Sequence, residues 1–303
     1  MTTVLQYVIY CIFRLMVGLF AILPLSYLYK LSDGLSFILQ YVIRYRKSVV
    51  MENLTACFPE KSKEEINAIQ KAFYSHLADI FLEGLKGFTM SDTELKERYK
   101  VVDPSILQKA KEDNVSILLA GSHYNNWEWG VLILNQWLDH QVSGIYQIVK
   151  NTFIHNYLMK TRSRWGMHLI SAKNAIKSII TFEGTHAVMI LSDQSPSNMR
   201  HAHWVHFLNR DTPCTHGLEV MAKKTNYPIY YMYVTKPRRG YYEVFIDPLI
   251  TQPGQYEAET ITAIYTKRLE ETIKKQPQYW LWSHDRWKRA TPRHKAMKEA
   301  FRR

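Results

Sequence analysis

A histidine, two amides and a glutamate flanked by two tryptophans follow directly after an apolar run. Residues 121–130 read GSHYNNWEWG, and they follow VSILLA at 115–120, which has the composition of a buried strand. His123 in the loop can meet Glu128 in the first turn of a following helix, although residues five apart within one helix diverge by about 140°. A Glu128 carboxylate bonded to one imidazole nitrogen would raise the basicity of the other. We therefore predict a general base that deprotonates a substrate hydroxyl for attack on an activated acyl carbon.

Alternating strands and helices are expected to position these residues. The pattern predicts strands at 115–119, 142–149, 167–171 and 187–191, with helices at 127–138, 154–165 and 172–182. Helical periodicity also covers 62–86, 217–225 and 258–275, a further helix starts at Asp103-Pro104, and a strand pair covers 228–234 and 241–246. The stretch between 194 and 217 is expected to be irregular. The order predicts an α/β fold with a mostly parallel mixed sheet flanked by helices.

Sites in such sheets form just beyond the carboxyl ends of the strands. His123 follows the strand at 115–119, and Asp193 and Gln194 follow the strand at 187–191. We therefore expect these side chains, far apart in the sequence, to lie close together.

The first thirty residues are almost continuously apolar. Residues 4–29 are long enough to cross a bilayer, which takes about 20 residues. Arg14 in the middle opposes this, because an arginine at the bilayer centre costs roughly 2.5–3.5 kcal/mol. A spanning helix, a helix half-embedded in one leaflet and a buried helix pair all remain open. Basic residues after a second apolar run at 35–43 favour a cytoplasmic main domain.

We divide the chain into three parts on this basis. Residues 1–45 form a membrane-anchoring helical segment, 46–288 the α/β domain, and 289–303 a basic C-terminal tail. The net charge of +12 favours an anionic partner. The end of the chain, 286–303, is strongly basic with Trp287 and Phe301 interleaved, which is typical of a segment on anionic lipid or an acidic carrier. A solvated tail is the alternative.

Several other classes of function are disfavoured. The sequence has no helix-turn-helix, RNP or zinc pattern, so we expect no nucleic-acid partner. The three cysteines have no paired spacing, which favours a reducing compartment. His201 and His203, with His206 nearby, are the one pattern that would suit a metal, but no HExxH is present. We predict neither a metal nor a cofactor.

Five blocks of sequence resemble a known family. GSHYNNWE at 121–128 resembles the H-x4-D/E block of the lysophospholipid acyltransferase superfamily. MENLTACFPE at 51–60, TRSRWG at 161–166, SDQ at 192–194 and PQYWLWSHDRWK at 277–288 are similar to blocks of one branch, the lipid A biosynthesis acyltransferases. The blocks stand in the family's order, and the resemblance extends to about residue 288.

The resemblance implies a glycerol-phosphate-acyltransferase-like fold and a bacterial inner-membrane enzyme that faces the cytoplasm. It implies transfer of a fatty acyl chain from acyl-carrier protein, or sometimes acyl-CoA, to a hydroxyl of a lipid A precursor. By position, His123 is the base and Glu128 its partner. The supporting and substrate-binding residues that we expect are Arg164, Asp193, Arg162, Tyr146, Gln194 and Arg210.

The chain departs from the family in three places. Tyr146-Gln147-Ile148 stands where Tyr-Arg-Pro is frequent, Phe207-Leu208-Asn209-Arg210 replaces F-F-G-R, and Ser195 replaces an acidic residue. These changes leave open an acceptor that is another lysolipid, glycolipid or amino-acid lipid. A non-catalytic membrane or carrier-binding protein is the remaining alternative, but it would not explain why both His123 and Glu128 are present.

Overall fold

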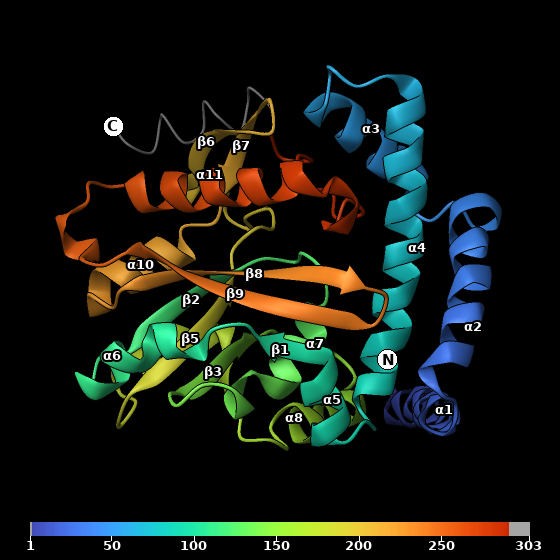
Figure 1. The fold of residues 1–303 in the computed structure, drawn as a ribbon, viewed down its shortest axis with the longest axis horizontal. Coiled ribbons are helices and arrows are strands. Elements are labelled where there is room, and N and C mark those ends of the chain that lie inside the picture. The colour runs from blue at the N-terminus through green and yellow to red at the C-terminus, as the bar shows by residue number, and fades with distance from the viewer. Residues whose placement is uncertain (1, 291–303) are drawn as a thin grey trace.

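A seven-stranded sheet with helices on both of its faces forms the centre of the computed structural model, which describes residues 2–290 (Figure 1). The strand order is β1-β9-β8-β2-β5-β3-β4, and every neighbouring pair is parallel except β8 with β9. The strands are β1 Tyr99–Val101, β2 Ile117–Gly121, β3 Gln141–Tyr146, β4 His168–Ser171, β5 His186–Leu191, β8 Ile229–Arg238 and β9 Tyr241–Ile250. The predicted fold class, a mostly parallel mixed sheet with flanking helices, is thereby confirmed.

The helices come from all parts of the chain. The α-helices are α1 Thr3–Ile22, α2 Leu25–Phe37, α3 Lys47–Cys57, α4 Lys63–Gly87, α5 Asp92–Arg98, α6 Gln108–Glu112, α7 Trp127–Ile133, α8 Thr152–Arg162, α9 Ala175–Ile180, α10 Gly217–Thr225 and α11 Thr260–Lys275. Shorter turns are the π-helix η1 Ile38–Val42 and the 3-10 turns η2 Pro104–Leu107, η3 Leu134–Gln136, η4 Ala172–Asn174, η5 Met199–His201, η6 Pro253–Gln255 and η7 Pro277–Tyr279.

Strand β2 lies between the two hydrophobic layers and is buried along its whole length. Leu118 and Ala120 pack into the core that contains α10 and α11, whereas Ile117 and Leu119 pack into the core that contains Trp129 of α7. Successive side chains of a strand point to opposite faces, so a strand covered on both faces needs a continuous apolar run. This is why residues 115–120 carry no polar alternation.

Two regions differ from the sequence prediction. Strands β6 His203–Phe207 and β7 Arg210–Cys214 form an antiparallel hairpin within the stretch that we expected to be irregular. Their polar and histidine-rich sequence hides the strand signal. Strand β3 ends at Tyr146, three residues earlier than predicted, and the helix expected at 127–138 ends at Ile133 and continues as a 3-10 turn.

The beginning of the basic C-terminal stretch is part of the core, which corrects the prediction that Trp287 meets lipid or a carrier. Arg286 and Trp287 are buried, and Trp287 donates its indole N–H to Thr212 Oγ1 at 2.7 Å. Arg286 donates to the carbonyl of Pro213 at 2.5 Å. Both side chains therefore tie the chain end to the β6–β7 hairpin. Residues 291–303 lie outside the described residues.

Helix α4 carries a buried carboxylate that joins four parts of the fold. Glu83 accepts hydrogen bonds from Tyr29 Oη of α2 (2.7 Å), Tyr242 Oη of β9 (2.6 Å) and Asn126 Nδ2 before α7 (2.8 Å). Burial raises the pKa of Glu83 to about 7, and it outweighs the opposing effects of the Lys236 charge and the tyrosine bonds. The ionised form is therefore the costly one in the folded protein.

We expect Glu83→Gln to stabilise the protein at alkaline pH. The carboxyl of Glu83 has a folded pKa above its ordinary 4.5, so its contribution to stability is present below pH 4.5 and is lost as the pH rises through about 7. Glutamine keeps an oxygen for Asn126 and Tyr242 and an N–H for Tyr29, but it cannot ionise. Denaturant titration at pH 8 should show a gain of roughly 1–3 kcal/mol that disappears at pH 4. A gain that is equal at both pH values would contradict the assignment.

Candidate active site

The two asparagines in the loop after β2 shape the backbone around the site. Asn125 has a left-handed conformation, with φ of 56°, which asparagine tolerates better than most residues. Its backbone N–H donates to the carbonyl of Tyr279 (3.0 Å), and its side-chain amide donates to the carbonyl of Val234 (2.6 Å). The first amide of the motif therefore makes the turn that presents His123.

Asn126 is the N-cap of α7. Its side-chain oxygen accepts the backbone N–H of Trp129 at 3.0 Å, and its amide group donates to Glu83. Trp129 is fully buried and donates its indole N–H to the carbonyl of Glu83 at 2.8 Å. Asn126 and Trp129 thus fix the start of α7, and with it the direction of the Glu128 side chain.

We expect Asn126→Ala to lower the free energy of unfolding by about 1–2 kcal/mol, because the helix loses its cap and Glu83 loses a donor. Asn174→Ala is the matched control, since Asn174 stands before α9 but makes no capping hydrogen bond with its side chain. Urea titration should show a change within about 0.5 kcal/mol for the control. Equal losses in the two variants would contradict the role given to Asn126.

His123 is held by Asp193, from the loop after the neighbouring strand β5. The imidazole Nδ1 lies 2.7 Å from Asp193 Oδ1, and the backbone N–H of His123 donates to Oδ2 at 3.0 Å. The indole N–H of Trp280 donates to the same Oδ2 at 2.8 Å. Strands β2 and β5 are parallel, with Gly121 opposite Leu191, so the two loops begin side by side. The expected proximity of His123 and Asp193 is confirmed.

The hydrogen bond that we predicted between Glu128 and His123 is not the one that forms. Glu128 instead bonds Nη2 of Arg162 through both carboxylate oxygens, at 2.9 and 3.2 Å. Asp193 takes the Nδ1 position because it enters from the adjacent strand, whereas Glu128 in the first turn of α7 points toward α8. The two carboxylates therefore have different partners, and Glu128 holds an arginine at the site.

The second imidazole nitrogen faces the side-chain amide of Gln194. Gln194 Nε2 lies 3.1 Å from His123 Nε2. Because Nδ1 donates its proton to Asp193, the neutral Nε2 is an acceptor, and the amide N–H fits it. The Trp127 ring stands edge-to-face with the imidazole, with 5.1 Å between the ring centroids. Gln194 thus covers the Nε2 side of the imidazole.

The charges around His123 favour its protonated form. Burial alone would lower the pKa of His123, but the charge of Asp193 and its hydrogen bond outweigh this, with a contribution from Glu128, and raise it above the ordinary value. Burial would raise the pKa of Asp193, but His123 and the donors around the carboxylate lower it. A proton taken up by Nε2 is therefore stabilised, as a general base requires.

A cavity of about 370 Å³ opens beside this pair. His123, Glu128, Arg162 and Gln194 form its polar part. The rest is mainly apolar and includes Val131, Gly144, Ile145, Leu169, Met189, Ile190 and Leu191. A polar reacting end next to an apolar wall suits an acyl chain.

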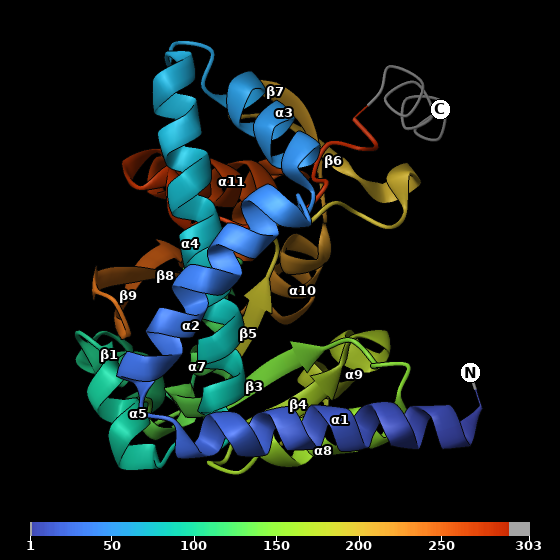
Figure 2. The same ribbon diagram turned by 90° about the vertical axis from the view of Figure 1, so that its right-hand side faces the viewer.

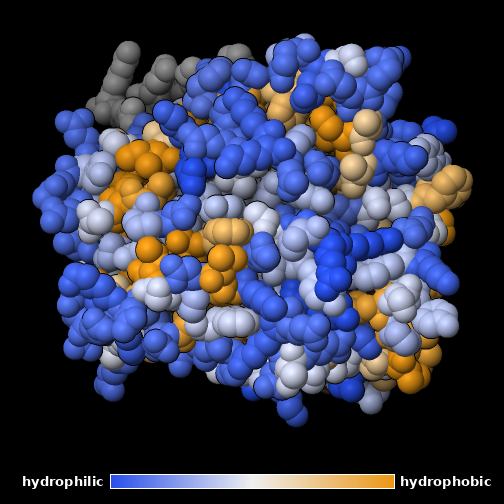
Figure 3. All heavy atoms as spheres, viewed as in Figure 1, coloured by the Kyte–Doolittle hydropathy of each residue, from blue (hydrophilic) through white to orange (hydrophobic). Residues whose placement is uncertain are grey.

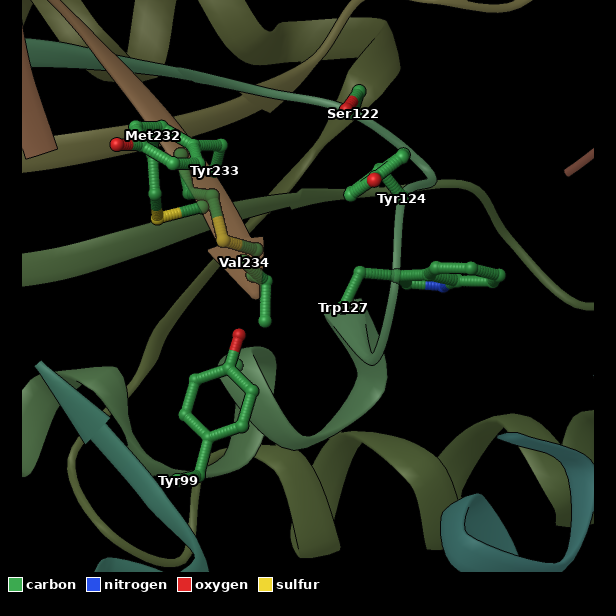
Figure 4. Close-up of a pocket in the computed structure, with 9 residues that line it drawn as sticks. Tyr99, Ser122, Tyr124, Trp127, Met232, Tyr233 and Val234 are labelled. Carbon is green, nitrogen blue, oxygen red and sulfur yellow. The ribbon is translucent and has the colours of Figure 1, made fainter. Parts of the chain in front are cut away.

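A second, much smaller cavity of about 10 Å³ shares the lining residues Trp127 and Met189 with the first. Figure 4 shows the hydroxyl of Tyr99 pointing toward Val234 in this space. The Tyr99 hydroxyl is buried and has no hydrogen-bond partner among the described residues.

The other expected site residues divide into two groups. Tyr146 and Arg162 line the large cavity, as does Gln147. Arg164 does not; it donates to the carbonyls of Gly87, Phe88 and Met90 at the end of α4 and stacks on the Trp165 ring at 3.7 Å. Arg210 lies at the start of β7, over the Trp287 ring at 4.6 Å. The last two arginines therefore hold elements together at a distance from the cavity.

Two residues of the C-terminal block support the site, and the sequence analysis did not single them out. Trp280 bonds Asp193, and His284 Nε2 accepts the backbone N–H of Ser195 at 3.0 Å. Together they fix the loop that carries Asp193 and Gln194. Both residues belong to the block at 277–288 that resembles the family. The block alone does not indicate which of its side chains point toward the site.

The histidines that suggested a metal have other surroundings. His203 Nδ1 contacts Thr262 Oγ1 at 2.9 Å and Glu219 at 3.4 Å, and His206 lies on the exposed hairpin, 3.8 Å from Asp211. Within residues 2–290, no three His, Cys, Asp or Glu side chains gather as a metal site would need.

A histidine–carboxylate pair at the carboxyl edge of a parallel sheet, beside an apolar cavity, defines a site suited to acyl transfer. The family model of the bacterial lipid A biosynthesis acyltransferases matches residues 2–289, and the chain belongs to this family. It is thus an acyltransferase of the lipid A biosynthesis family, as the sequence blocks predicted.

Curated relatives agree with this assignment at low identity. The chain is 22% identical over 270 residues to the lipid A biosynthesis palmitoleoyltransferase of Escherichia coli K12, covering 88% of this chain and 86% of the relative. It is 23% identical over 268 residues to the lipid A biosynthesis lauroyltransferase of the same strain, covering 88% and 87%. A lipid A biosynthesis acyltransferase of Shigella flexneri is 22% identical over 270 residues, covering 88% and 86%.

Proposed function

We propose that this enzyme transfers a fatty acyl chain from a thioester donor, acyl-carrier protein or acyl-CoA, to a hydroxyl of a lipid A precursor. The observation that carries the proposal is the His123–Asp193 pair, whose second imidazole nitrogen, Nε2, is bonded, within residues 2–290, only to the Gln194 amide in the lining of a half-apolar cavity. The two relatives named for their acyl groups, a palmitoleoyltransferase and a lauroyltransferase, support a long-chain donor.

The proposed reaction uses His123 as the base. Asp193 holds the proton on Nδ1, so the lone pair of Nε2 faces the cavity once the acceptor displaces the Gln194 amide. The acceptor hydroxyl gives its proton to Nε2, and its oxygen attacks the thioester carbonyl carbon. The new C–O bond forms, the C–S bond breaks, and the leaving thiolate takes the proton from the imidazolium. Asp193 stabilises the imidazolium in between.

Arg162 is the proposed anion-binding group. It lines the cavity and uses Nη2 for Glu128, whereas its buried Nε has no partner among the described residues. A guanidinium in the lining of the same cavity as His123 can bind the developing oxyanion or a phosphate of the acceptor. In this role Glu128 orients Arg162, and its charge also adds to the raised pKa of His123.

We further propose that the enzyme acts on the cytoplasmic side of the bacterial inner membrane. Helix α1 is the one helix in residues 2–290 that is long and apolar enough to cross a membrane. The net charge of +12 would attract an acidic carrier protein and anionic headgroups alike. Both substrates of the proposed reaction, a carrier-bound acyl chain and a membrane lipid, suit this location.

A related acceptor is the second candidate, and one residue favours it. Gln147 lines the cavity at the position where the family often has arginine. A neutral amide there removes a cation that could bind a phosphate, which suits a lysolipid, glycolipid or amino-acid lipid with another headgroup.

The test is acyl transfer by the purified full-length protein with a panel of substrates. Acyl-carrier-protein and CoA thioesters of several lengths would be offered with a lipid A precursor, a lysophospholipid and an amino-acid lipid. We expect one added acyl group on the lipid A precursor, detected by mass spectrometry. Transfer to the lysophospholipid alone, or to the amino-acid lipid alone, would overturn the acceptor assignment and leave the reaction type standing.

A further inference from the structure

Helix α1 lies lengthwise against the catalytic domain instead of projecting from it (Figure 2). Near its beginning, Gln6 accepts the backbone N–H of Thr152 through its side chain (3.1 Å), and the Gln6 carbonyl accepts the side chain of Asn151 (2.8 Å). At its end, the carbonyl of Ala21 accepts Lys86 Nζ at 2.7 Å. Both ends of α1 are therefore tied to the domain, one to the start of α8 and the other to α4.

The middle of α1 also packs on α8, and this explains Arg14. Phe13 packs edge-to-face on Tyr157, with 5.5 Å between the ring centroids. The guanidinium of Arg14 lies over the same Tyr157 ring at 4.6 Å and contacts Tyr10 Oη at 3.4 Å. The charge that opposes a bilayer crossing is thus directed toward α8 and a tyrosine hydroxyl.

The side of α1 that faces away from α8 is apolar and uncovered, and Tyr7, at its edge, also packs its ring on Phe153 of α8 with 5.3 Å between the ring centroids. Its exposed apolar side chains are between 37 and 78% accessible; they are Val4, Leu5, Tyr7, Val8, Ile9, Ile12, Leu15, Leu19 and Ile22. Helix α2 and the π-helix η1 add Tyr27, Leu31, Phe37, Ile38, Tyr41, Val42 and Ile43, all exposed. We name these sixteen residues the apolar face. Apolar patches of this extent mark interaction surfaces.

The apolar face lies on one side of the domain. Helices α1 and α2 stand together at the right-hand edge of Figure 1, and both face the viewer in Figure 2. In Figure 3, one of several groups of hydrophobic spheres lies at the lower right, where α1 is seen end-on in Figure 1. The two helices that carry the apolar face therefore lie on the same side of the domain.

Aromatic and basic residues pair at the border of this face. Lys30 Nζ lies 5.4 Å from the ring centroid of Tyr27, and Lys47 Nζ lies 5.2 Å from that of Tyr41. Exposed Arg44 stands between Tyr41 and Lys47 in the sequence. Tyrosines with an apolar body and a polar tip, flanked by lysines that reach to headgroups, are typical of a bilayer surface with anionic lipids. A second copy of the chain carries a net charge of +12 and would repel these cations.

We propose that the apolar face is embedded in one leaflet of an anionic membrane, with α1 lying in the membrane plane and not crossing it. Helix α8 carries α1 on one side and Arg162, which lines the catalytic cavity, near its end. The cavity is therefore about one helix diameter, roughly 10 Å, from the embedded surface. An acceptor lipid in the same leaflet reaches His123 without crossing the membrane. The membrane-plane arrangement of α1 goes beyond the proposed reaction, and it can be tested by membrane binding without measuring acyl transfer.

The first test is binding of the purified full chain to vesicles of phosphatidylethanolamine and phosphatidylglycerol. Ile12→Glu with Leu19→Glu alters the centre of the apolar face, and we expect the fraction bound to fall at least about tenfold. Ile180→Glu is the matched control, because Ile180 is equally exposed but lies on α9. Unchanged vesicle binding by the double variant, or a dimer that keeps the apolar face covered in the presence of vesicles, would overturn the proposal.

The second test separates a helix in the membrane plane from a spanning helix. In a Cys11→Ser background, the pair Gln6→Cys and Thr152→Cys should be joined by a short bismaleimide cross-linker in the vesicle-bound protein, because the end of the Gln6 side chain reaches the Thr152 backbone. Val8→Cys with Thr152→Cys should not, since Val8 faces outward. A spanning α1 would carry residue 6 away from Thr152, so absence of the first cross-link in folded, vesicle-bound protein would overturn the membrane-plane arrangement.

Discussion

His123→Ala should lower kcat/KM for acyl transfer by about 10²–10⁴-fold, the contribution typical of a positioned general base. The reason is the position of His123 Nε2, which faces the cavity. Its only partner among the described residues is the Gln194 amide, which the acceptor hydroxyl can displace. Binding of the acyl chain should change little, because the apolar wall of the cavity is contributed by other residues. The measurement is initial rate against donor and acceptor concentration.

The control for this variant is His206→Ala, which removes an exposed histidine of the β6–β7 hairpin. Its rate should stay within about twofold of the wild type. Circular dichroism would establish that both variants are folded. A folded His123→Ala protein with wild-type turnover would show that another group takes the proton.

Asp193→Asn should have the second largest effect, also in the range of about 10²–10⁴-fold on kcat. Asp193 accepts three hydrogen bonds, from His123 Nδ1, the His123 backbone and Trp280. Asparagine has a single acceptor oxygen, so at least one of these buried donors loses its partner and the imidazole loses its orientation. The loss of negative charge also removes the main reason for the raised pKa of His123.

The pH profile distinguishes this role from a merely structural one. The base works only when neutral, so wild-type activity should rise with pH through the raised pKa of His123. Without the Asp193 charge that pKa falls, and the acidic limb should move to lower pH. Glu128→Gln should move the limb less, because Glu128 contributes less to the shift. If the acidic limb stays in place in Asp193→Asn, or moves further in Glu128→Gln than in Asp193→Asn, then Glu128 and not Asp193 is the carboxylate that sets the pKa of His123.

The overall architecture could be predicted from the sequence because it depends on local patterns. The buried runs at 115–119 and 187–191 are apolar on both faces, and the Ser62 and Glu65 capping box marks the start of α4. Parallel neighbouring strands then bring His123 and Asp193 together without further information. The β6–β7 hairpin was missed because its strands are short and rich in polar residues. The hairpin is held in place by tertiary contacts with Trp287, which packs on Phe207 and bonds Thr212.

The partner of His123 could not be predicted from the sequence in the same way. Glu128 is close in the sequence, and a short spacing favours it, but the direction of its side chain is set by the Asn126 cap and by Arg162 on α8. Asp193 is seventy positions away and is held by Trp280 from the end of the chain. These are tertiary contacts, and they have no periodicity that a sequence pattern can show.

The two arginines of the TRSRWG block illustrate the same limit. Arg162 and Arg164 are two residues apart, yet one lines the cavity and the other bonds three carbonyls at the end of α4. Residues two apart at the end of a helix point in different directions, so the block cannot indicate which arginine serves the reaction.

The central claim is direct transfer, in which the lipid hydroxyl attacks the thioester with His123 as its base and no acyl-enzyme forms. It is tested by incubating the purified protein with a labelled acyl thioester, with and without the lipid A precursor, and measuring the intact mass of the protein. We predict label on the lipid when acceptor is present and unmodified protein in both cases. A protein carrying one acyl group in the absence of acceptor would contradict the account and point to a nucleophile, with Ser122 beside His123 the first to examine.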